Sequence, residues 1–193
     1  MLEKEIQKYC PKNQQEWREW LAKNHKSVNS IWLVFYKTKS SKHNLTWSEA
    51  VDQALCYGWI DSTKRTIDHE SYIQYFCPRK PNSNWSKINK DKVKVLEEKG
   101  LMTKAGRDSI EIAKENGSWT ILDSIEAMII PEDLEHEFQK SSGSMDYFLT
   151  LSKTIKKGIL YWVKSAKRPE TRSKRIKEVA EKISIQTVPK QFK

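Results

Sequence analysis

The sequence predicts an α+β protein, with a small antiparallel sheet of three or four strands and flanking helices in its amino-terminal half and only helices in its carboxy-terminal half. Two observations favour this class. Short runs rich in β-branched and aromatic residues lie before Pro78 and Pro81. After these prolines, apolar residues recur every three or four positions as far as Ile183. We therefore expect a sheet-containing part over residues 1–84 and a helical part over residues 85–193, which together form one compact unit.

Capping and apolar patterns place the elements of the sheet-containing part. Asn13 is a favourable cap for a helix over residues 14–25. The apolar run Ile31–Tyr36 is too short for a good helix and predicts a strand that is covered on both faces. Thr46 and Glu49 have the spacing of a capping box, which begins the next helix. Three more segments have the composition of strands, at Trp59–Asp61, Arg65–Asp68 and Tyr72–Cys77.

The helical part is expected to contain a succession of helices. Helical spacing and capping residues place them at residues 86–99, 104–116, 144–150 and 153–166, with two more that begin at Pro131 and Pro169. The last two helices are expected to join at Lys167–Pro169 and to bury Ile159, Trp162 and Ile176. The residues after Ser184 are expected to be loosely packed.

Composition and charge exclude several classes of protein. The net charge is +10, yet residues 108–151 hold ten acidic and two basic side chains, whereas residues 152–193 hold three acidic and 13 basic ones. Such blocks are typical of solvated faces, although a basic end can also meet nucleic acid or anionic lipid. No run approaches the ~18 apolar residues of a membrane-spanning helix. Because Met1–Cys10 lacks the apolar core of a signal peptide and cysteines number only 3, we expect a cytoplasmic protein without membrane insertion.

The tract over residues 59–89 carries the candidate binding site. Tyr72, Gln74 and Phe76 share one face of the expected strand, and a buried glutamine between two aromatic residues needs hydrogen-bond partners or a polar pocket. We predict a polar cleft with aromatic walls that binds a small polar or anionic ligand, without a cofactor or metal. Its predicted ligand-binding residues are Trp59, Asp61, Arg65, Asp68, Tyr72, Gln74, Arg79, Ser83, Trp85, Ser86 and Asn89. The alternative is a network of ion pairs and caps that fixes the sheet to the next helix.

Alternation along the strands suggests how the cleft is assembled. Six side chains are expected on one concave surface, namely Trp59, Asp61, Arg65, Gln74, Arg79 and Trp85. Arg79 would offer two parallel donors to an anion, and the amino terminus of the next helix would add free N–H groups. Ser83 or Asn84 is the expected cap of that helix.

Two other functions remain open from the residues alone. Asp61 or Asp68 could act as an acid or a base in the cleft of an enzyme. The tract Phe76–Lys94 mixes aromatic with basic side chains, which makes nucleic-acid binding a weaker alternative. Cys77 lies near two basic residues that could activate its thiol. The 4 histidines are scattered, and none has the spacing of a zinc site.

Several motifs together resemble the YdeI/OmpD-associated family (OmdA), whose members are also called bacteriocin-protection proteins. The motifs follow one another at Ile31–Lys37, Leu45–Val51, Ala54–Ser62, Tyr72–Pro81 with Ser83–Ser86 and Asn89, Gly100–Met102 and Tyr161–Ile176. The resemblance extends from about Glu16 to Ile183, with Tyr57 and Cys77 standing where the family pattern has Phe and Thr.

The resemblance implies a bacterial protein linked to bacteriocin tolerance and, by association, to an outer-membrane porin. It supplies no catalytic residue. Small frataxin-like proteins have a tail similar to Ala166–Thr171, which implies an iron-handling alternative for the acidic segment Glu132–Glu137. The sequence thus favours a cytosolic, non-catalytic protein that protects against stress or binds a ligand.

Overall fold

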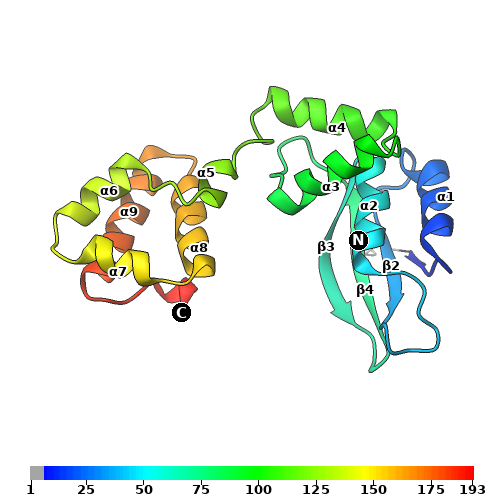
Figure 1. The fold of residues 1–193 in the computed structure, drawn as a ribbon, viewed down its shortest axis with the longest axis horizontal. Coiled ribbons are helices and arrows are strands. Elements are labelled where there is room, and N and C mark those ends of the chain that lie inside the picture. The colour runs from blue at the N-terminus through cyan, green and yellow to red at the C-terminus, as the bar shows by residue number, and fades with distance from the viewer. Residues whose placement is uncertain (1–6) are drawn as a thin grey trace, which may run out of the picture. The chain divides into compact units, whose positions relative to one another are not determined.

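A computed structural model of the protein describes residues 7–193. Packing divides the chain into two compact units, with the division between Thr120 and Ile121. The predicted α+β class is confirmed, because the strands lie near the amino terminus and the carboxy-terminal half is helical (Figure 1). The change from mixed to helical secondary structure occurs near residue 85, so the first unit also contains the two helices that follow this change.

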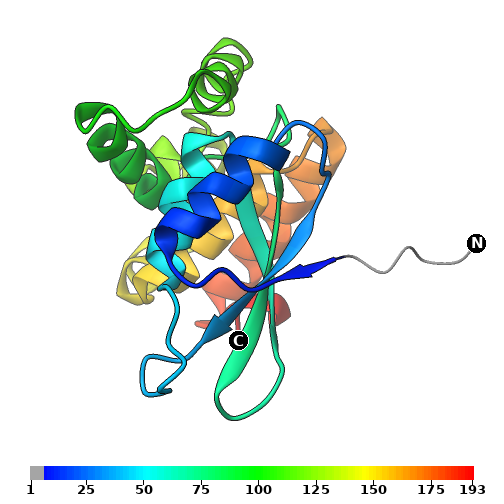
Figure 2. The same cartoon turned by 90° about the vertical axis from the view of Figure 1, so that its right-hand side faces the viewer.

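The first unit contains a four-stranded sheet with the order β1-β2-β4-β3. Its strands are β1 (Lys8–Tyr9), β2 (Ile31–Tyr36), β3 (Trp59–Thr66) and β4 (Ser71–Pro78). β2 and β3 both pair antiparallel with β4, whereas β1 pairs parallel with β2 and makes the sheet mixed. The segments expected separately at Trp59–Asp61 and Arg65–Asp68 belong to one strand, which ends at Thr66. Figure 2 shows the β3–β4 hairpin with its turn at the same end of the sheet as the loop that follows β2.

Helices pack on one face of this sheet. The helices of the first unit are α1 (Gln14–Asn24), α2 (Trp47–Cys56), α3 (Lys87–Glu98) and α4 (Lys104–Glu115). Ile31, Leu33 and Phe35 alternate along β2 and are fully buried in a core that also contains Trp17 of α1 and Ala50 of α2. The predicted strand and the two predicted helices around it therefore form the centre of this unit.

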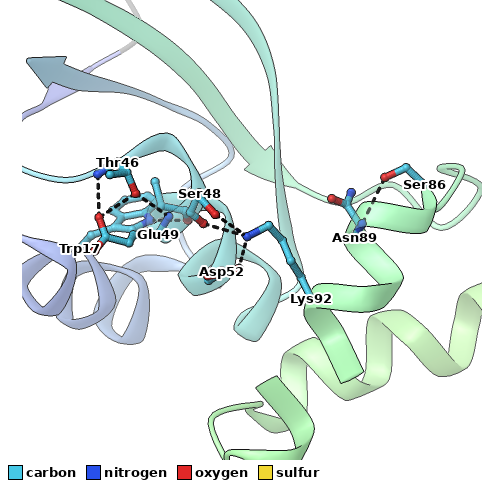
Figure 3. Close-up of polar contacts among 9 residues, drawn as sticks. Trp17, Thr46, Ser48, Glu49, Asp52, Ser86, Asn89 and Lys92 are labelled. Atoms are coloured by element: carbon cyan, nitrogen blue, oxygen red, sulfur yellow. Dashed lines mark hydrogen bonds and ion pairs between the residues drawn. The ribbon is translucent and has the colours of Figure 1, made fainter. Parts of the chain in front are cut away.

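Side-chain caps begin these helices. The capping box is confirmed at α2, where Thr46 accepts a hydrogen bond from the backbone of Glu49 and the Glu49 carboxylate accepts one from the Thr46 backbone. At α3 the expected cap is wrong: Ser86, and not Ser83 or Asn84, accepts the hydrogen bond from the backbone N–H of the third helical residue. Figure 3 shows both caps.

Lys92 fixes α3 to α2. Its Nζ donates to Ser48 Oγ and to Asp52 Oδ1, each at 2.7 Å (Figure 3). The Lys92 and Asp52 side chains are only 17% and 27% exposed, so solvent screens this ion pair less than a surface pair. Lys92 is therefore committed to a contact inside the fold.

Helix α4 approaches the end of α2 closely enough to require a glycine. Thr103 caps α4, and its hydroxyl also donates to the carbonyl oxygen of Cys56 at 2.6 Å. Gly106 lies on the first turn of α4, where an added Cβ would stand 2.4 Å from the same carbonyl oxygen. The backbones of the two helices therefore leave no room for a side chain at this position.

The second unit is built from helices. They are α5 (Asp123–Glu126), α6 (Glu132–Gln139), α7 (Ser144–Thr150), α8 (Lys153–Lys164), α9 (Pro169–Ser184) and the 3-10 helix η1 (Lys190–Phe192). Phe138 and Phe148 pack with their ring centroids 5.1 Å apart in a core that includes Ile159 and Ile176, both buried as predicted. Within residues 7–193, no helix combines the length and the apolar character needed to cross a membrane.

Two expectations for the second unit need correction. Trp162 is only partly buried: it packs against the edge of the core, and the Phe192 ring and the Arg175 guanidinium lie beside its ring. The segment after Ser184 is not loosely packed, since Val188 is 8% exposed and belongs to the core. Val188 and Phe192 of this segment pack against the core, whereas Ile185 is exposed.

Candidate functional site

The β3–β4 hairpin places part of the predicted site on the helix-covered face of the sheet. Phe76 pairs with Asp61 across the hairpin and is fully buried in the core. The shared face of Tyr72, Gln74 and Phe76 is confirmed by their pairing with β2, where their partners are Phe35, Leu33 and Ile31. Tyr72 stacks on Phe35, with ring centroids 5.0 Å apart.

A bulge in β3 removes Arg65 from this face. The pairing shifts by one residue between Asp61 and Lys64, so Lys64 pairs with Gln74 and Arg65 pairs with Ile73. The Arg65 guanidinium therefore lies on the opposite face, 4.8 Å from the Trp32 ring centroid. The expectation that Arg65 joins Asp61 on one concave surface is wrong, because simple alternation does not count the bulged residue.

Lys64 and Trp47 lie beside the predicted site residues, although the sequence analysis did not include them in the site. The Lys64 Nζ lies 3.9 Å from the Tyr72 ring centroid, and Trp47 Nε1 donates to Asp61 Oδ2 at 2.8 Å. Trp47 is the first residue of α2 and is 42% exposed. Its role depends on a contact between segments that are distant in the sequence, which no local pattern reports.

Gln74 has the hydrogen bonds that its burial requires. It is 4% exposed, and its Nε2 donates to Asp61 Oδ2 at 2.9 Å and to the Ser62 carbonyl at 2.8 Å. Asp61 thus accepts from both Gln74 and Trp47 and joins the sheet to α2. A carboxylate has about four acceptor positions, so Asp61 retains capacity for another donor.

Asp68 has a structural role in the turn between β3 and β4. Asp61 lies near the other end of β3. Its Oδ1 accepts from Glu70 N, Ser71 N and Ser71 Oγ at 2.7–2.9 Å. These bonds, first of all that from Glu70, lower the pKa of Asp68 below its ordinary value of 3.8. A carboxylate held ionised in this way is poorly suited to act as a proton donor.

Replacing Asp68 with asparagine is expected to destabilise the hairpin in a pH-dependent manner. Because the pKa of Asp68 is lowered on folding, its stabilising contribution is complete above its ordinary pKa of 3.8 and is lost as the pH falls through the lower folded-state value. Denaturant unfolding of the wild-type and Asp68→Asn proteins should therefore differ at neutral pH, with a difference that shrinks below pH 3.8 and vanishes below the folded-state pKa of Asp68. Asp91→Asn, on an exposed residue of α3, serves as the control; equal differences at both pH values would contradict the prediction.

Arg79 and Trp85 form the second group of site residues. Arg79 follows β4 directly, and its guanidinium carbon lies 3.8 Å from the centroid of the Trp85 ring, which is 1% exposed. Arg79 Nη1 donates to the Asn84 carbonyl at 3.0 Å. Within the described part of the chain, Arg79 Nε, Arg79 Nη2 and Trp85 Nε1 are buried and have no hydrogen-bond partner. This concentration of unpaired donors is costly unless an acceptor joins them.

The guanidinium of Arg79 keeps its charge despite this burial. Burial lowers the pKa of Arg79 to about 10, and the charge of Asp61 acts in the opposite direction. Arg79 is therefore protonated at neutral pH. A buried cation without a paired anion is unfavourable in a folded protein, which makes this position a candidate for binding an anion.

The remaining predicted residues have structural positions around these groups. Trp59 is 1% exposed and donates from Nε1 to the His25 carbonyl at 3.1 Å, so it belongs to the core and does not wall an open cleft. Ser86 and Asn89 take part in the α3 cap, and the Ser83 backbone donates to the Lys80 carbonyl. The structure thus brings together Asp61 with Gln74, and Arg79 with Trp85.

The other chemistries considered from the sequence gain no support from these contacts. Burial raises the pKa of the Cys77 thiol and outweighs the two neighbouring cations. No cluster of three or more metal-ligating side chains occurs among residues 7–193. In the basic tract Phe76–Lys94, Lys92 is paired with Asp52 and is therefore not free to contact a nucleic-acid backbone.

Two family models match the chain. A model described as a domain of unknown function (DUF8412) matches residues 9–109, which lie within the first unit and include the site. A model described as bacteriocin-protection, YdeI or OmpD-associated (OmdA) matches residues 127–184, within the second unit, and confirms the resemblance for this part of the chain. No curated protein and no solved structure matches.

Proposed function

This chain belongs to the DUF8412 family, whose description names no activity, and we propose that it is a non-catalytic protein that binds a small polar or anionic molecule. The observation that carries the proposal is a group of three buried donors that have no partner among residues 7–193, namely Arg79 Nε, Arg79 Nη2 and Trp85 Nε1. An anion between them would supply the missing acceptors and would compensate the charge of Arg79.

The segment beside these donors supports access by a ligand. Residues 79–86 form no helix or strand. The segment is held at Arg79, whose backbone N–H donates to the Gly58 carbonyl, and at Pro81, whose carbonyl accepts from Asn116 and Ser118, so a displacement that leaves the sheet paired involves the residues after Pro81. Such irregular segments on a rigid scaffold commonly carry binding sites. The donors are covered in the structure, and binding therefore involves a local movement of this segment.

The wider role in our proposal is stress protection in the cytoplasm. The support for this role is the name of the family whose model matches the second unit, which refers to bacteriocin protection. An enzyme using Asp61 has less support, because Asp68 is committed to the turn and Asp61 is left without a second acid or base among the predicted residues.

Arg79→Gln is expected to abolish the stabilisation of the protein by small anions. We would measure the melting temperature of the full chain with a panel of carboxylates, phosphates and sulfate at millimolar concentrations. A ligand at 100 times its dissociation constant stabilises a protein by ~2.7 kcal/mol, which shifts the melting temperature by several degrees. The expected result is a shift in the wild-type protein that is lost in Arg79→Gln.

Arg65→Gln is the matched control for this experiment. It removes a guanidinium from the same hairpin, but on the opposite face of the sheet, and should leave the shift unchanged. Circular dichroism would verify that both variants are folded. An equal shift in the wild-type protein and in Arg79→Gln would overturn the proposed site.

A further inference from the structure

The donors left free on Arg79 have a defined arrangement. Nη1 is occupied by the Asn84 carbonyl, and the two free nitrogens are Nε and Nη2. These two nitrogens form one edge of the planar guanidinium and point in parallel, which matches the two oxygens of a carboxylate or two oxygens of a phosphate. The site therefore selects a forked anionic group over a single-atom acceptor.

The balance of charge favours a singly charged anion. Arg79 carries one positive charge, and the negative charge of Asp61 is close enough to affect the pKa of Arg79. Cys77 is the other group that acts on Arg79, and its raised pKa leaves the thiol neutral at neutral pH. A dianionic phosphate beside Arg79 would be repelled by Asp61 and only half compensated, whereas a carboxylate would be matched by the single cation.

Asp61 also offers a position for a positive group. It is half-buried, and the hydrogen bonds that it accepts from Trp47 and Gln74 both reach Oδ2. Asp61 pairs with Phe76, which precedes Arg79 by three residues, or roughly 10 Å of extended backbone. The arginine side chain is long enough to bring its guanidinium closer to Asp61 than this backbone distance. One small molecule with charges of both signs would satisfy both ends of the site.

We propose, resting on the binding function above, that the ligand is a zwitterion of the amino-acid class, with its carboxylate on the Nε–Nη2 edge of Arg79 and its ammonium group toward Asp61. Trp85 Nε1 donates to the same carboxylate. In this arrangement the ligand carboxylate pairs with the buried guanidinium of Arg79, and the ligand ammonium group donates to Asp61. The ligand adds no net charge to the site.

Titration of the ¹⁵N-labelled full chain tests this assignment, with the indole N–H signals as the readout. The Trp85 signal is identified by its loss in Trp85→Phe. The probes are L-alanine, propanoate, which has the same carbon skeleton without the ammonium group, and inorganic phosphate. We expect L-alanine to shift the Trp85 signal at a concentration about tenfold lower than propanoate, since a charge-assisted hydrogen bond to Asp61 is worth about that factor.

Variants separate the two ends of the site. Asp61→Asn should abolish the preference for L-alanine over propanoate, because it removes the acceptor of the ammonium group and also the negative charge that repels an anion. Arg79→Lys, which retains the charge but not the fork, should weaken the binding of both. If phosphate or propanoate binds at least as tightly as L-alanine, the zwitterion assignment is overturned and the binding function stands. If none of the three probes shifts the Trp85 signal in the folded wild-type protein, both fall.

Discussion

Trp17→Ala is expected to lower the free energy of unfolding of the first unit by about 3–5 kcal/mol, the cost typical of truncating a fully buried tryptophan. Trp17 is 0% exposed and packs against Trp20 and Phe76, with ring centroids 5.2 and 5.6 Å away. Its Nε1 also donates to the Ala50 carbonyl at 3.1 Å. The substitution therefore leaves a cavity and removes the hydrogen bond to the Ala50 carbonyl.

Chemical denaturation followed by far-UV circular dichroism would measure this loss. Trp17→Phe keeps most of the volume and removes the hydrogen bond, so it should cost only part of the loss seen for alanine. Trp47→Ala is the surface control, because Trp47 is 42% exposed and contributes one hydrogen bond. If Trp17→Ala cost no more than Trp47→Ala, the assignment of Trp17 to the centre of the core would be wrong.

Gly106→Ala is expected to destabilise the same unit by about 2–3 kcal/mol, the upper part of the range for overpacking. The new Cβ would stand 2.4 Å from the Cys56 carbonyl oxygen and 2.8 Å from that of Leu55. Both contacts are with backbone, so α4 must move away from α2 to relieve them. This movement would also stretch the bonds that Thr103 donates to Cys56.

Gly158→Ala is the matched control for Gly106→Ala, since both glycines lie inside helices. Alanine gains up to ~1 kcal/mol of helix propensity over glycine at either position. At Gly158 the nearest atom to a new Cβ belongs to the Phe192 side chain, at 3.1 Å, and a side-chain ring can shift by a few tenths of an ångström more easily than a helix backbone. Gly158→Ala should therefore be close to neutral by the same measurement. Equal losses in the two variants would contradict the close approach of α4 to α2.

The parts of the fold that the sequence predicts well are those with local causes. The capping box of Thr46 and Glu49 and the apolar run of β2 each specify an element by themselves, and both occur as expected. β1 has only two residues and exists through its parallel pairing with β2, so nothing in its own composition marks it as a strand. Val188 is likewise buried through its contacts with the core of the second unit, and no pattern in its own segment predicts them.

The candidate site was less predictable because its geometry depends on pairing between distant segments. Gln74 could be recognised as a buried polar residue in need of partners, and it has them. The position of Arg65 depends on one extra residue in β3, which reverses the faces for the rest of the strand. Trp47 reaches Asp61 across the contact of α2 with β3, and no periodicity in either segment predicts that contact.

The bulge between Asp61 and Lys64 has a consequence for self-association. β3 is the last strand in the sheet order, and among residues 7–193 no strand pairs with its outer edge, the kind of edge at which a strand from another molecule could add. A bulge interrupts the regular spacing of donors and acceptors and increases the local twist, and the charged side chains of Lys64 and Arg65 follow directly. An incoming strand would meet a discontinuous ladder and concentrated positive charge. The irregularity that moves Arg65 away from the candidate site thus also protects the edge of the sheet against aggregation.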